Sequence, residues 1–325
     1  MNEERMQSYV TLIQQLLSCP NGHYFKFLMT VLQTIAESKG NPDVIYPLFK
    51  ENQGMLDETL GTILQQWGQE TFKTVSSDQA NYMAAVIVTF GNLIQQFPLG
   101  NKGNNMELAI TAYNCALEVY TREAFPVQWA TTQNNLGAAY RGRIKEDKAE
   151  NLELAITAYN CALEVYTREA FPVDWARTQN NLGNAYSDRI KEDKAENLEL
   201  AITAYNCALE VRTREAFPVD WAMTQNNLGN AYRDRNEVPE AIACYRNALT
   251  IRTPETDPYD CIQTGRNLGN LGFNHQQWDI AIEGYKTAIE AVETARSWAK
   301  TDQRRQDILR DGIQMYENIV QCYIN

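Results

Sequence analysis

The sequence contains little of the material from which catalytic and metal sites are usually built. It has only two histidines, His23 and His275, and its seven cysteines are an odd number with no Cys-x-x-Cys pair. A Cys–His nucleophilic pair or a histidine-rich metal site is therefore not expected. No glycine-rich phosphate-binding loop is present, since the recurring Leu-Gly pairs suit helix packing. We accordingly predict no enzyme activity, no catalytic residues, no metal site and no cofactor.

Long apolar runs and an excess of basic charge are also missing. No stretch reaches the roughly 18 apolar residues of a membrane-spanning helix, and the N-terminus lacks the basic and apolar segments of a secretion signal. Aspartate and glutamate outnumber lysine and arginine by 41 to 29, which gives a net charge of −12. This charge repels phosphate backbones and anionic lipid, so nucleic acid and membranes are not expected as partners. We expect a cytoplasmic protein.

What the sequence does have is an internal repeat with a period of 46 residues. Residues 108–153 and 154–199 align without a gap and differ at only five positions. A third copy begins at Leu200 and follows the pattern up to Arg235, and fainter copies flank these three. Each unit contains two stretches in which apolar residues recur at spacings of three and four, which predicts a helical hairpin. Such hairpins cannot bury their apolar faces alone, so they are expected to stack into a solenoid.

The repeat predicts an all-α chain with three parts. A helical capping segment is expected over residues 1–75, a solenoid of five hairpins over 76–294 and a capping helix over 295–325. The N-terminal segment could instead be a separate interaction module, and the last helix could instead lead into another domain. The predicted first helices lie near 77–97, 127–145, 173–191, 219–234 and 258–274, and their partner helices near 105–122, 151–168, 197–214, 237–252 and 277–293. Before the hairpins, helices are expected near 22–38 and 53–73, after an amphipathic helix that carries Met6, Tyr9, Val10, Ile13, Leu16 and Leu17.

The repeated residues resemble a known family. Leu136-Gly137-x-x-Tyr140, followed by Ala155-x-x-x-Tyr159-x-x-Ala162, is similar to the signature of tetratricopeptide repeats. Relative to the usual 34-residue repeat, the 46-residue unit carries six extra residues in each of two loops. The resemblance implies a right-handed superhelical solenoid in which the first helices line a concave groove. It also implies a non-catalytic scaffold that binds a protein or peptide in that groove.

A closer resemblance concerns the long repeats themselves. The run Arg-Glu-Ala-Phe-Pro-Val-Asp-Trp-Ala-x-Thr-Gln-Asn-Asn-Leu-Gly-Asn-Ala-Tyr resembles the repeats of cyanobacterial proteins that carry a caspase-like CHAT domain. No CHAT domain lies within the 325 residues, so a protease activity is not carried over. The alternative function is a regulatory or sensor region of such a protease, whose catalytic domain is absent from this chain.

The differences between the two most similar units define a candidate binding face. All five fall on one stripe of the first helix, whereas Leu136, Tyr140 and Ile144, which we assign to a packing stripe, have identical counterparts. This pattern is expected if each unit presents its own surface on a common scaffold, although neutral drift at exposed positions would also produce it. The candidate ligand contacts on this face are Asn134, Asn135, Arg141, Arg177, Asn180, Asn181, Asn184, Asn226, Asn227, Asn230, Arg233, Arg266 and Asn270.

Our hypothesis is that the asparagine amides clamp the main chain of a bound peptide, to which they can both donate and accept hydrogen bonds. The arginines would select acidic side chains or a free C-terminus. Two alternatives remain open. The amides could cap helices or bond between repeats, and the near-identical stacking surfaces could support self-association.

Overall fold

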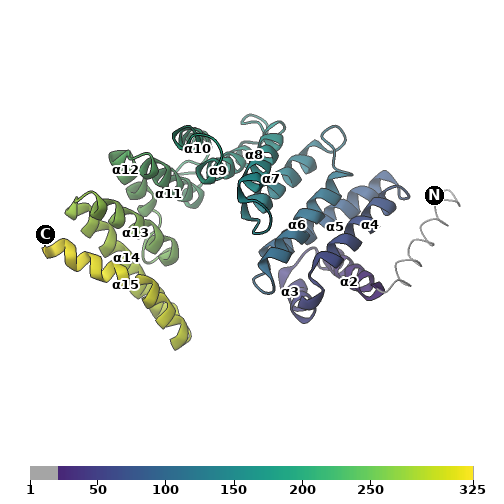
Figure 1. Ribbon diagram of the computed structural model, residues 1–325, viewed down its shortest axis with the longest axis horizontal. Helices are drawn as coiled ribbons and strands as arrows, with labels where there is room; N and C mark the ends of the chain where they lie inside the picture. Colours follow the sequence, from purple (N-terminus) through teal and green to yellow (C-terminus); the bar gives the residue numbers. More distant parts are fainter. Residues whose placement is uncertain (1–20, 325) are drawn as a thin grey trace. The chain divides into compact units, whose positions relative to one another are not determined.

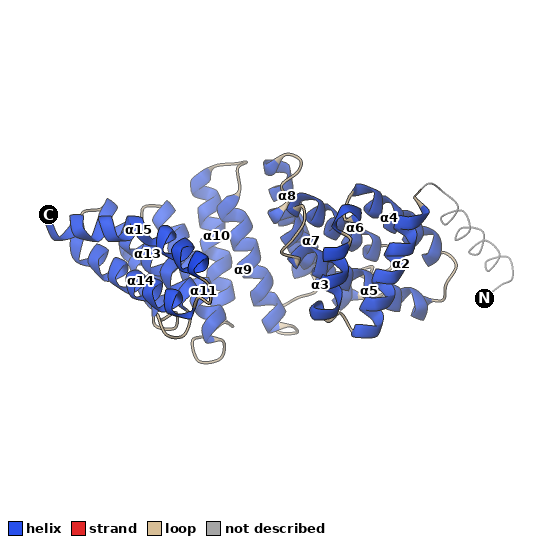
Figure 2. Cartoon of the chain, turned by 90° about the horizontal axis from the view of Figure 1, so that it is seen from below, coloured by secondary structure: helices blue, strands red, loops and turns tan. Residues whose placement is uncertain are grey.

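The computed structural model describes residues 21–324, and all the regular structure in this range is helical (Figure 2). The all-α prediction is therefore confirmed. The predicted amphipathic helix from Met6 to Leu17 lies outside the described residues. Within that range, no helix combines the length and apolar character that crossing a bilayer would require.

The helices form two compact units, a first that ends at Ala170 and a second that begins at Phe171. The helices of the first unit are α2 (Gly22–Ser38), α3 (Pro42–Glu51), the 3₁₀ turn η1 (Gln53–Met55), α4 (Glu58–Phe72), α5 (Ser77–Gln96), α6 (Lys102–Leu117), α7 (Pro126–Gly142) and α8 (Lys148–Leu163) (Figure 1). Those of the second are α9 (Pro172–Asp188), α10 (Lys194–Leu209), α11 (Pro218–Asp234), α12 (Val238–Leu249), α13 (Pro258–Asn274), α14 (Trp278–Trp298) and α15 (Asp302–Ile324).

All five predicted hairpins are present. In the first unit α5 pairs with α6 and α7 with α8, while α6 also packs on α7. In the second unit the pairs are α9 with α10, α11 with α12 and α13 with α14, and α10 and α12 each pack on the first helix of the following hairpin. At the ends of the array, α2 contacts α5, α4 contacts α6, and α15 lies against α14. Each unit is thus a stack of helical hairpins.

The helix boundaries in the long units differ from the prediction. The first helix α7 ends at Gly142, so Ile144 is in the following loop, where it is 68% exposed rather than part of the packing stripe. The partner helix α8 begins at Lys148, because the Asp147 side chain accepts a hydrogen bond from the backbone N–H of Glu150 at 2.9 Å and caps it. Residues 145–150, which connect the two predicted helices, are therefore half helical. The partner helices α8 and α10 also end earlier than predicted, at Leu163 and Leu209.

The N-terminal part contains one helix that the sequence pattern did not indicate. Pro42 occupies the first turn of α3, and the Asn41 side chain accepts from the backbone N–H of Asp43 at 3.0 Å. Both features are typical of a helix start. The predicted helices near 22–38 and 53–73 correspond to α2 and to η1 with α4.

The cysteines of the repeats differ in burial. Cys115 is 1% exposed, as expected for a small buried group, whereas Cys161 and Cys207 are only partly buried. Burial raises the pKa of the Cys115 thiol to about 12. The cysteines between residues 21 and 324 are not joined in disulfides.

The two helices of each hairpin meet where a glycine on the first helix faces a buried tyrosine on the second. A Cβ added to Gly137 would lie 2.7 Å from Cε1 of Tyr159, and one added to Gly183 would lie 2.7 Å from Cε1 of Tyr205. The pairs in the other hairpins are Gly91 with Tyr113, Gly229 with Tyr245, and Gly269 with Tyr285. These tyrosines are among the largest fully buried side chains. The close approach of the two helices therefore requires a residue without a Cβ.

We expect Gly183→Ala to lower the free energy of unfolding by about 1–2 kcal/mol, because overpacking against Tyr205 exceeds the gain in helix propensity. Urea or thermal unfolding measures the effect. Gly54→Ala is the matched control, since no atom lies within 4 Å of the Cβ it would add. A Gly183→Ala protein as stable as the parent would contradict this view of the contact.

Candidate functional site

In four of the five hairpins, the residue after this glycine is an asparagine that the same tyrosine holds. The hydroxyl of Tyr205 donates to Oδ1 of Asn184 at 2.9 Å, and that of Tyr245 donates to Oδ1 of Asn230 at 2.8 Å. Two further pairs, Tyr285 with Asn270 and Tyr113 with Asn92, have the same bond at 2.8 Å. The tyrosine that fills the space over the glycine therefore also fixes the neighbouring amide.

The partners of these amides define which end of the amide group points inward. Oδ1 of Asn230 also accepts from Nη1 of Arg233 at 3.5 Å, and a guanidinium can only donate. The hydroxyl of Tyr285 accepts from Nδ2 of Asn318 at 3.0 Å, so its own hydrogen is directed to Asn270. With Oδ1 bonded to the tyrosine, the Nδ2 group of each amide points away from the hairpin contact. Neither Asn184, Asn230 nor Asn270 donates this group to another described residue.

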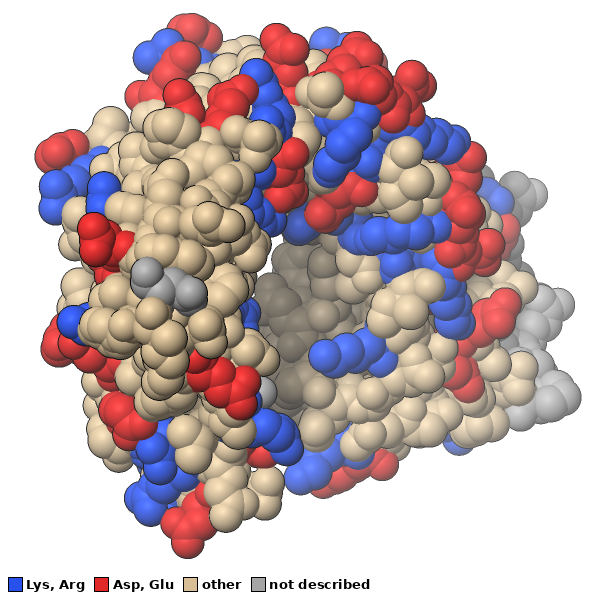
Figure 3. Space-filling model, turned by 60° about the vertical axis from the view of Figure 1, so that its left-hand side comes forward, with Lys and Arg blue, Asp and Glu red and all other residues tan. Residues whose placement is uncertain are grey.

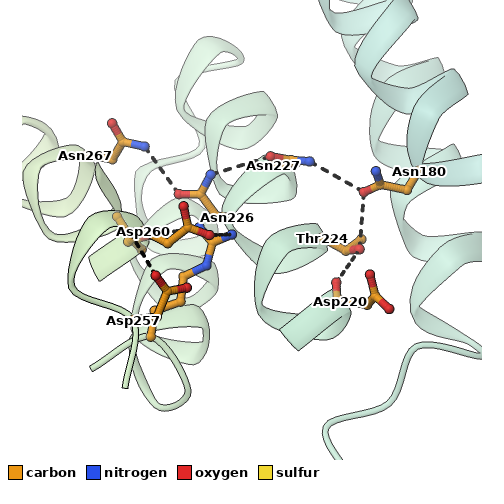
Figure 4. A network of polar contacts seen from close by, with 10 residues as sticks. Asn180, Asp220, Thr224, Asn226, Asn227, Asp257, Asp260 and Asn267 are labelled. Atoms are coloured by element: carbon orange, nitrogen blue, oxygen red, sulfur yellow. Dashed lines mark hydrogen bonds and ion pairs between the residues drawn. The ribbon is translucent and has the colours of Figure 1, made fainter. Parts of the chain in front are cut away.

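A second set of asparagines bonds between successive hairpins (Figure 4). Nδ2 of Asn227 on α11 reaches Oδ1 of Asn180 on α9 at 3.5 Å, and Oδ1 of Asn180 also accepts from Oγ1 of Thr224 at 3.2 Å. One hairpin later, Nδ2 of Asn267 on α13 donates to Oδ1 of Asn226 at 3.3 Å. In the first unit, Asn135 donates in the same way to Asn92 at 3.0 Å. These amides connect the first helices of neighbouring hairpins.

Burial separates the predicted asparagines into two groups. Asn134, Asn180 and Asn226 are 4%, 2% and 3% exposed, so they do not form part of an accessible face. This corrects our hypothesis for those three residues: for Asn180 and Asn226 the structure shows the alternative, bonding between repeats. Ligand contact by the remaining asparagines stays a prediction. Of these, Asn270 is exposed, and Asn135, Asn181, Asn184, Asn227 and Asn230 are half-buried.

The predicted arginines also differ in their surroundings. Arg177 pairs with Asp174 at 2.6 Å and Arg233 with Asp234 at 2.8 Å, and all four side chains are at least a third exposed. Exposed pairs of this kind are weak and can exchange for a ligand carboxylate. Arg266, by contrast, is exposed and has no hydrogen bond or ion pair to any residue that the structure describes. Arg141 is half-buried near the end of α7.

Two buried arginines connect hairpins in a way that we did not predict. Arg212 and Arg252 stand where the preceding hairpins have a tyrosine such as Tyr166, and they are 6% and 5% exposed. Each donates at 3.1 Å to a threonine of the following first helix, Thr224 or Thr264, and pairs with the aspartate four residues before it. Tyr166 bonds to Thr131 and Val127 of its own hairpin. Burial lowers the pKa of both guanidinium groups. In the sequence, the change from Tyr166 to Arg212 at equivalent positions of the repeat indicates this different role.

The described residues offer little for metal chemistry or for a strongly charged ligand surface. No group of three or more His, Cys, Asp or Glu side chains in residues 21–324 is arranged to hold a metal ion. Acidic and basic side chains are interspersed on the face drawn in Figure 3. What the site offers is a repeated set of neutral hydrogen-bonding groups with arginines beside them.

The second hairpin lacks the bond between tyrosine and asparagine, because Ala138 takes the place of the asparagine and Tyr159 has no hydrogen-bond partner among the described residues. We expect Ala138→Asn to supply this partner and to raise the free energy of unfolding by about 0.5–1.5 kcal/mol. Thermal unfolding is the measurement. In the background Tyr159→Phe the gain should disappear; an equal gain there would show that the hydroxyl is not the cause.

Comparison with known proteins gives one family match. Residues 221–253, which cover most of α11 and all of α12, match the tetratricopeptide repeat family. No curated protein matches the sequence. The matched hairpin lies within the internal repeat, so the neighbouring hairpins share its sequence pattern.

Several solved structures are similar to this chain. The apo form of RapI has a TM-score of 0.55 at 16% identity over 91% of this chain and 85% of that chain. The C-terminal part of a TPR repeat-containing protein from Cytophaga hutchinsonii has a TM-score of 0.47 at 14% identity, over 92% and 98% of the two chains. A MamA protein has a TM-score of 0.45 at 18% identity, over 67% and 96%. At these identities the likeness to RapI concerns the fold alone. The family match, the internal repeat and the hairpin architecture together support a tetratricopeptide repeat protein.

Proposed function

We propose that this chain is a non-catalytic interaction scaffold that binds an extended protein segment or peptide across the first helices of its second unit. The observation that carries the proposal is the row of oriented amides formed by Asn184, Asn230 and Asn270. Each amide is fixed through Oδ1 by a buried tyrosine and has Nδ2 unused by the described residues.

The chemistry of the row suits a polypeptide main chain. The same donor is repeated on α9, α11 and α13, so the complementary ligand has acceptors repeated along a line. Helices in contact lie about 8–10 Å apart, which is about the length of one three-residue turn of a polyproline II chain. Backbone carbonyls on one side of such a chain recur at that interval, and an amide that is already oriented loses little entropy when it bonds to one.

Selectivity would come from the positions that vary between hairpins. One turn before the buried asparagine position, α9, α11 and α13 carry Arg177, Met223 and Gln263. Near their C-terminal ends they carry Ser187, Arg233 and Phe273. None of these six side chains is buried. With Arg177 and Arg233 among them, the face favours a ligand that has acidic side chains or a free C-terminus.

A second candidate function is the sensor region of a caspase-like hydrolase, supported by the resemblance of the long repeats to those of CHAT-associated proteins. The coding sequence downstream of Asn325 tests it. We also propose self-association through the stacking surfaces and a cytoplasmic location. Light scattering over a range of concentrations tests the former.

The amide row can be tested with a peptide selected on the immobilised chain from a random 12-residue display library. Asn184→Asp with Asn270→Asp keeps the acceptor for each tyrosine and removes both donors. We expect this variant to bind the peptide roughly 10- to 30-fold more weakly in fluorescence polarisation, because two hydrogen bonds of about 1 kcal/mol each are lost.

The matched control is Asn160→Asp with Asn247→Asp, which makes the same charge change on exposed asparagines of the second helices α8 and α12. It should leave the affinity within twofold. If the selection yields no binding peptide, or if the row variant binds as tightly as the parent, the proposed function is wrong.

A further inference from the structure

The last hairpin departs from the repeat at the position of the buried asparagine. When the first helices are aligned on Leu182, Leu228 and Leu268, Arg266 takes the place that Asn180 and Asn226 hold in α9 and α11. Two neighbouring positions change as well, with Tyr259 in place of valine and Ile262 in place of alanine. A large aromatic, a larger aliphatic and a cationic side chain thus replace smaller neutral ones on a single face of α13.

The position of this face in the fold accounts for its different exposure. Asn226 is 3% exposed because α13 covers it and Asn267 bonds to it. The helix that follows this hairpin is α15, which packs against α14 and contacts α13 without making a hydrogen bond to Arg266. A pocket of about 220 Å³ lies between α13 and α15, and its lining residues are Tyr259, Ile262, Gln263, Arg266, Arg304 and Ile308.

The pocket contains two positive charges without a carboxylate partner in the described part of the chain. Arg266 makes no ion pair, and the guanidinium of Arg304 lies over the ring of Tyr259, 5.6 Å from its centroid. Nearby arginines are paired, as Arg246 is with Glu283 and Arg310 with Asp307. In a protein with a net charge of −12, two adjacent arginines without acidic partners are an unusual local feature.

The remaining lining is apolar or neutral. Ile308 is 5% exposed and, with Ile262, supplies an aliphatic wall, while the exposed Gln263 offers an amide between the Tyr259 and Arg266 turns of α13. Guanidinium groups bind carboxylates through paired hydrogen bonds, and an apolar pocket with a few converging polar groups is typical of ligand sites.

We propose that this pocket binds a peptide carboxylate that lies next to an apolar side chain. Arg266 and Arg304 hold the carboxylate, Gln263 donates to it, and the apolar side chain packs against Tyr259 and Ile308. The carboxylate is either the C-terminus of the peptide or an acidic side chain. This site rests on the proposed function because its ligand is also a polypeptide. Binding in the pocket does not require the row of amides.

Saturation-transfer NMR with three short probes tests the site on the full chain. The probes are N-acetyl-Gly-Leu with a free carboxylate, N-acetyl-Glu-Leu amide and N-acetyl-Gly-Leu amide. We expect saturation transfer to the leucine methyls of at least one carboxylate-bearing probe to exceed that of the neutral amide at least fivefold. Transfer to the first alone identifies a C-terminal ligand, and transfer to the second alone identifies an acidic side chain.

Two variants examine the arginines separately. Arg266→Asn introduces the residue that the earlier hairpins have at this position, and Arg304→Gln changes an exposed side chain of α15. Each should weaken binding of the carboxylate probe about 10-fold or more, the loss expected for a charged hydrogen bond. The control Arg214→Gln, which changes an exposed arginine that lies over Trp221, should not alter it.

The proposal is overturned if no probe receives saturation, if the neutral amide matches the carboxylates, or if neither variant weakens binding. The single variant Asn184→Asp, which lies on α9 and not beside Arg266, separates this site from the amide row. It should leave binding of the short probes unchanged, even though we expect it to weaken the long peptide.

Discussion

The contact between a first-helix glycine and a second-helix tyrosine is the constraint on which the rest of this structure depends. It permits the two helices of a hairpin to approach until the tyrosine ring covers the glycine, as Tyr205 covers Gly183. At that separation the tyrosine hydroxyl passes beyond the glycine and reaches the amide of the next residue, Asn184. A packing contact that holds the hairpin together thereby also positions a polar group at its edge. Because Tyr205 is only 2% exposed, the bond to Asn184 also satisfies a donor that would otherwise be costly to bury.

Because these amides are held in the same orientation, they all present the same donor group on this face. An asparagine free to rotate presents either its oxygen or its nitrogen to a ligand, whereas one that accepts from a tyrosine hydroxyl presents its nitrogen. Asn230 shows this most clearly, since the tyrosine, Asn267 and Arg233 all donate to its oxygen. A row of groups with the same polarity favours a ligand whose acceptors repeat, and it gives no preference among side chains. Discrimination between ligands then belongs to the residues that vary from one hairpin to the next.

Sequence periodicity predicted the hairpins, because helical spacing and the glycine and proline positions are local properties of the chain. It could not separate Asn180 from Asn184, which lie one turn apart on the same stripe. Their difference arises from α11, whose Asn227 and Thr224 cover Asn180 and leave Asn184 half-buried. Burial by a neighbouring hairpin is a long-range property, and the spacing of residues on one helix does not contain it. Ile144 was misassigned for a related reason: an apolar residue in register with a helix lies outside it when the helix ends at Gly142.

The same reasoning explains why the end of an array is where new chemistry can arise. Each internal hairpin presents one stacking surface to the next, and residues such as Asn226 and Arg252 are fixed by the partners they meet there. Arg252 can be buried because Thr264 and Asp260 of the next hairpin bond to its Nη1 and Nη2 groups. On the last hairpin the neighbour is α15, which contacts α13 but offers Arg266 no hydrogen-bond or ion-pair partner among the described residues. An arginine at the position of Asn226 would bring an uncompensated charge into the interior of the stack, at a cost of several kcal/mol. On α13 the same substitution leaves Arg266 in an accessible pocket, where a ligand can supply the missing negative charge.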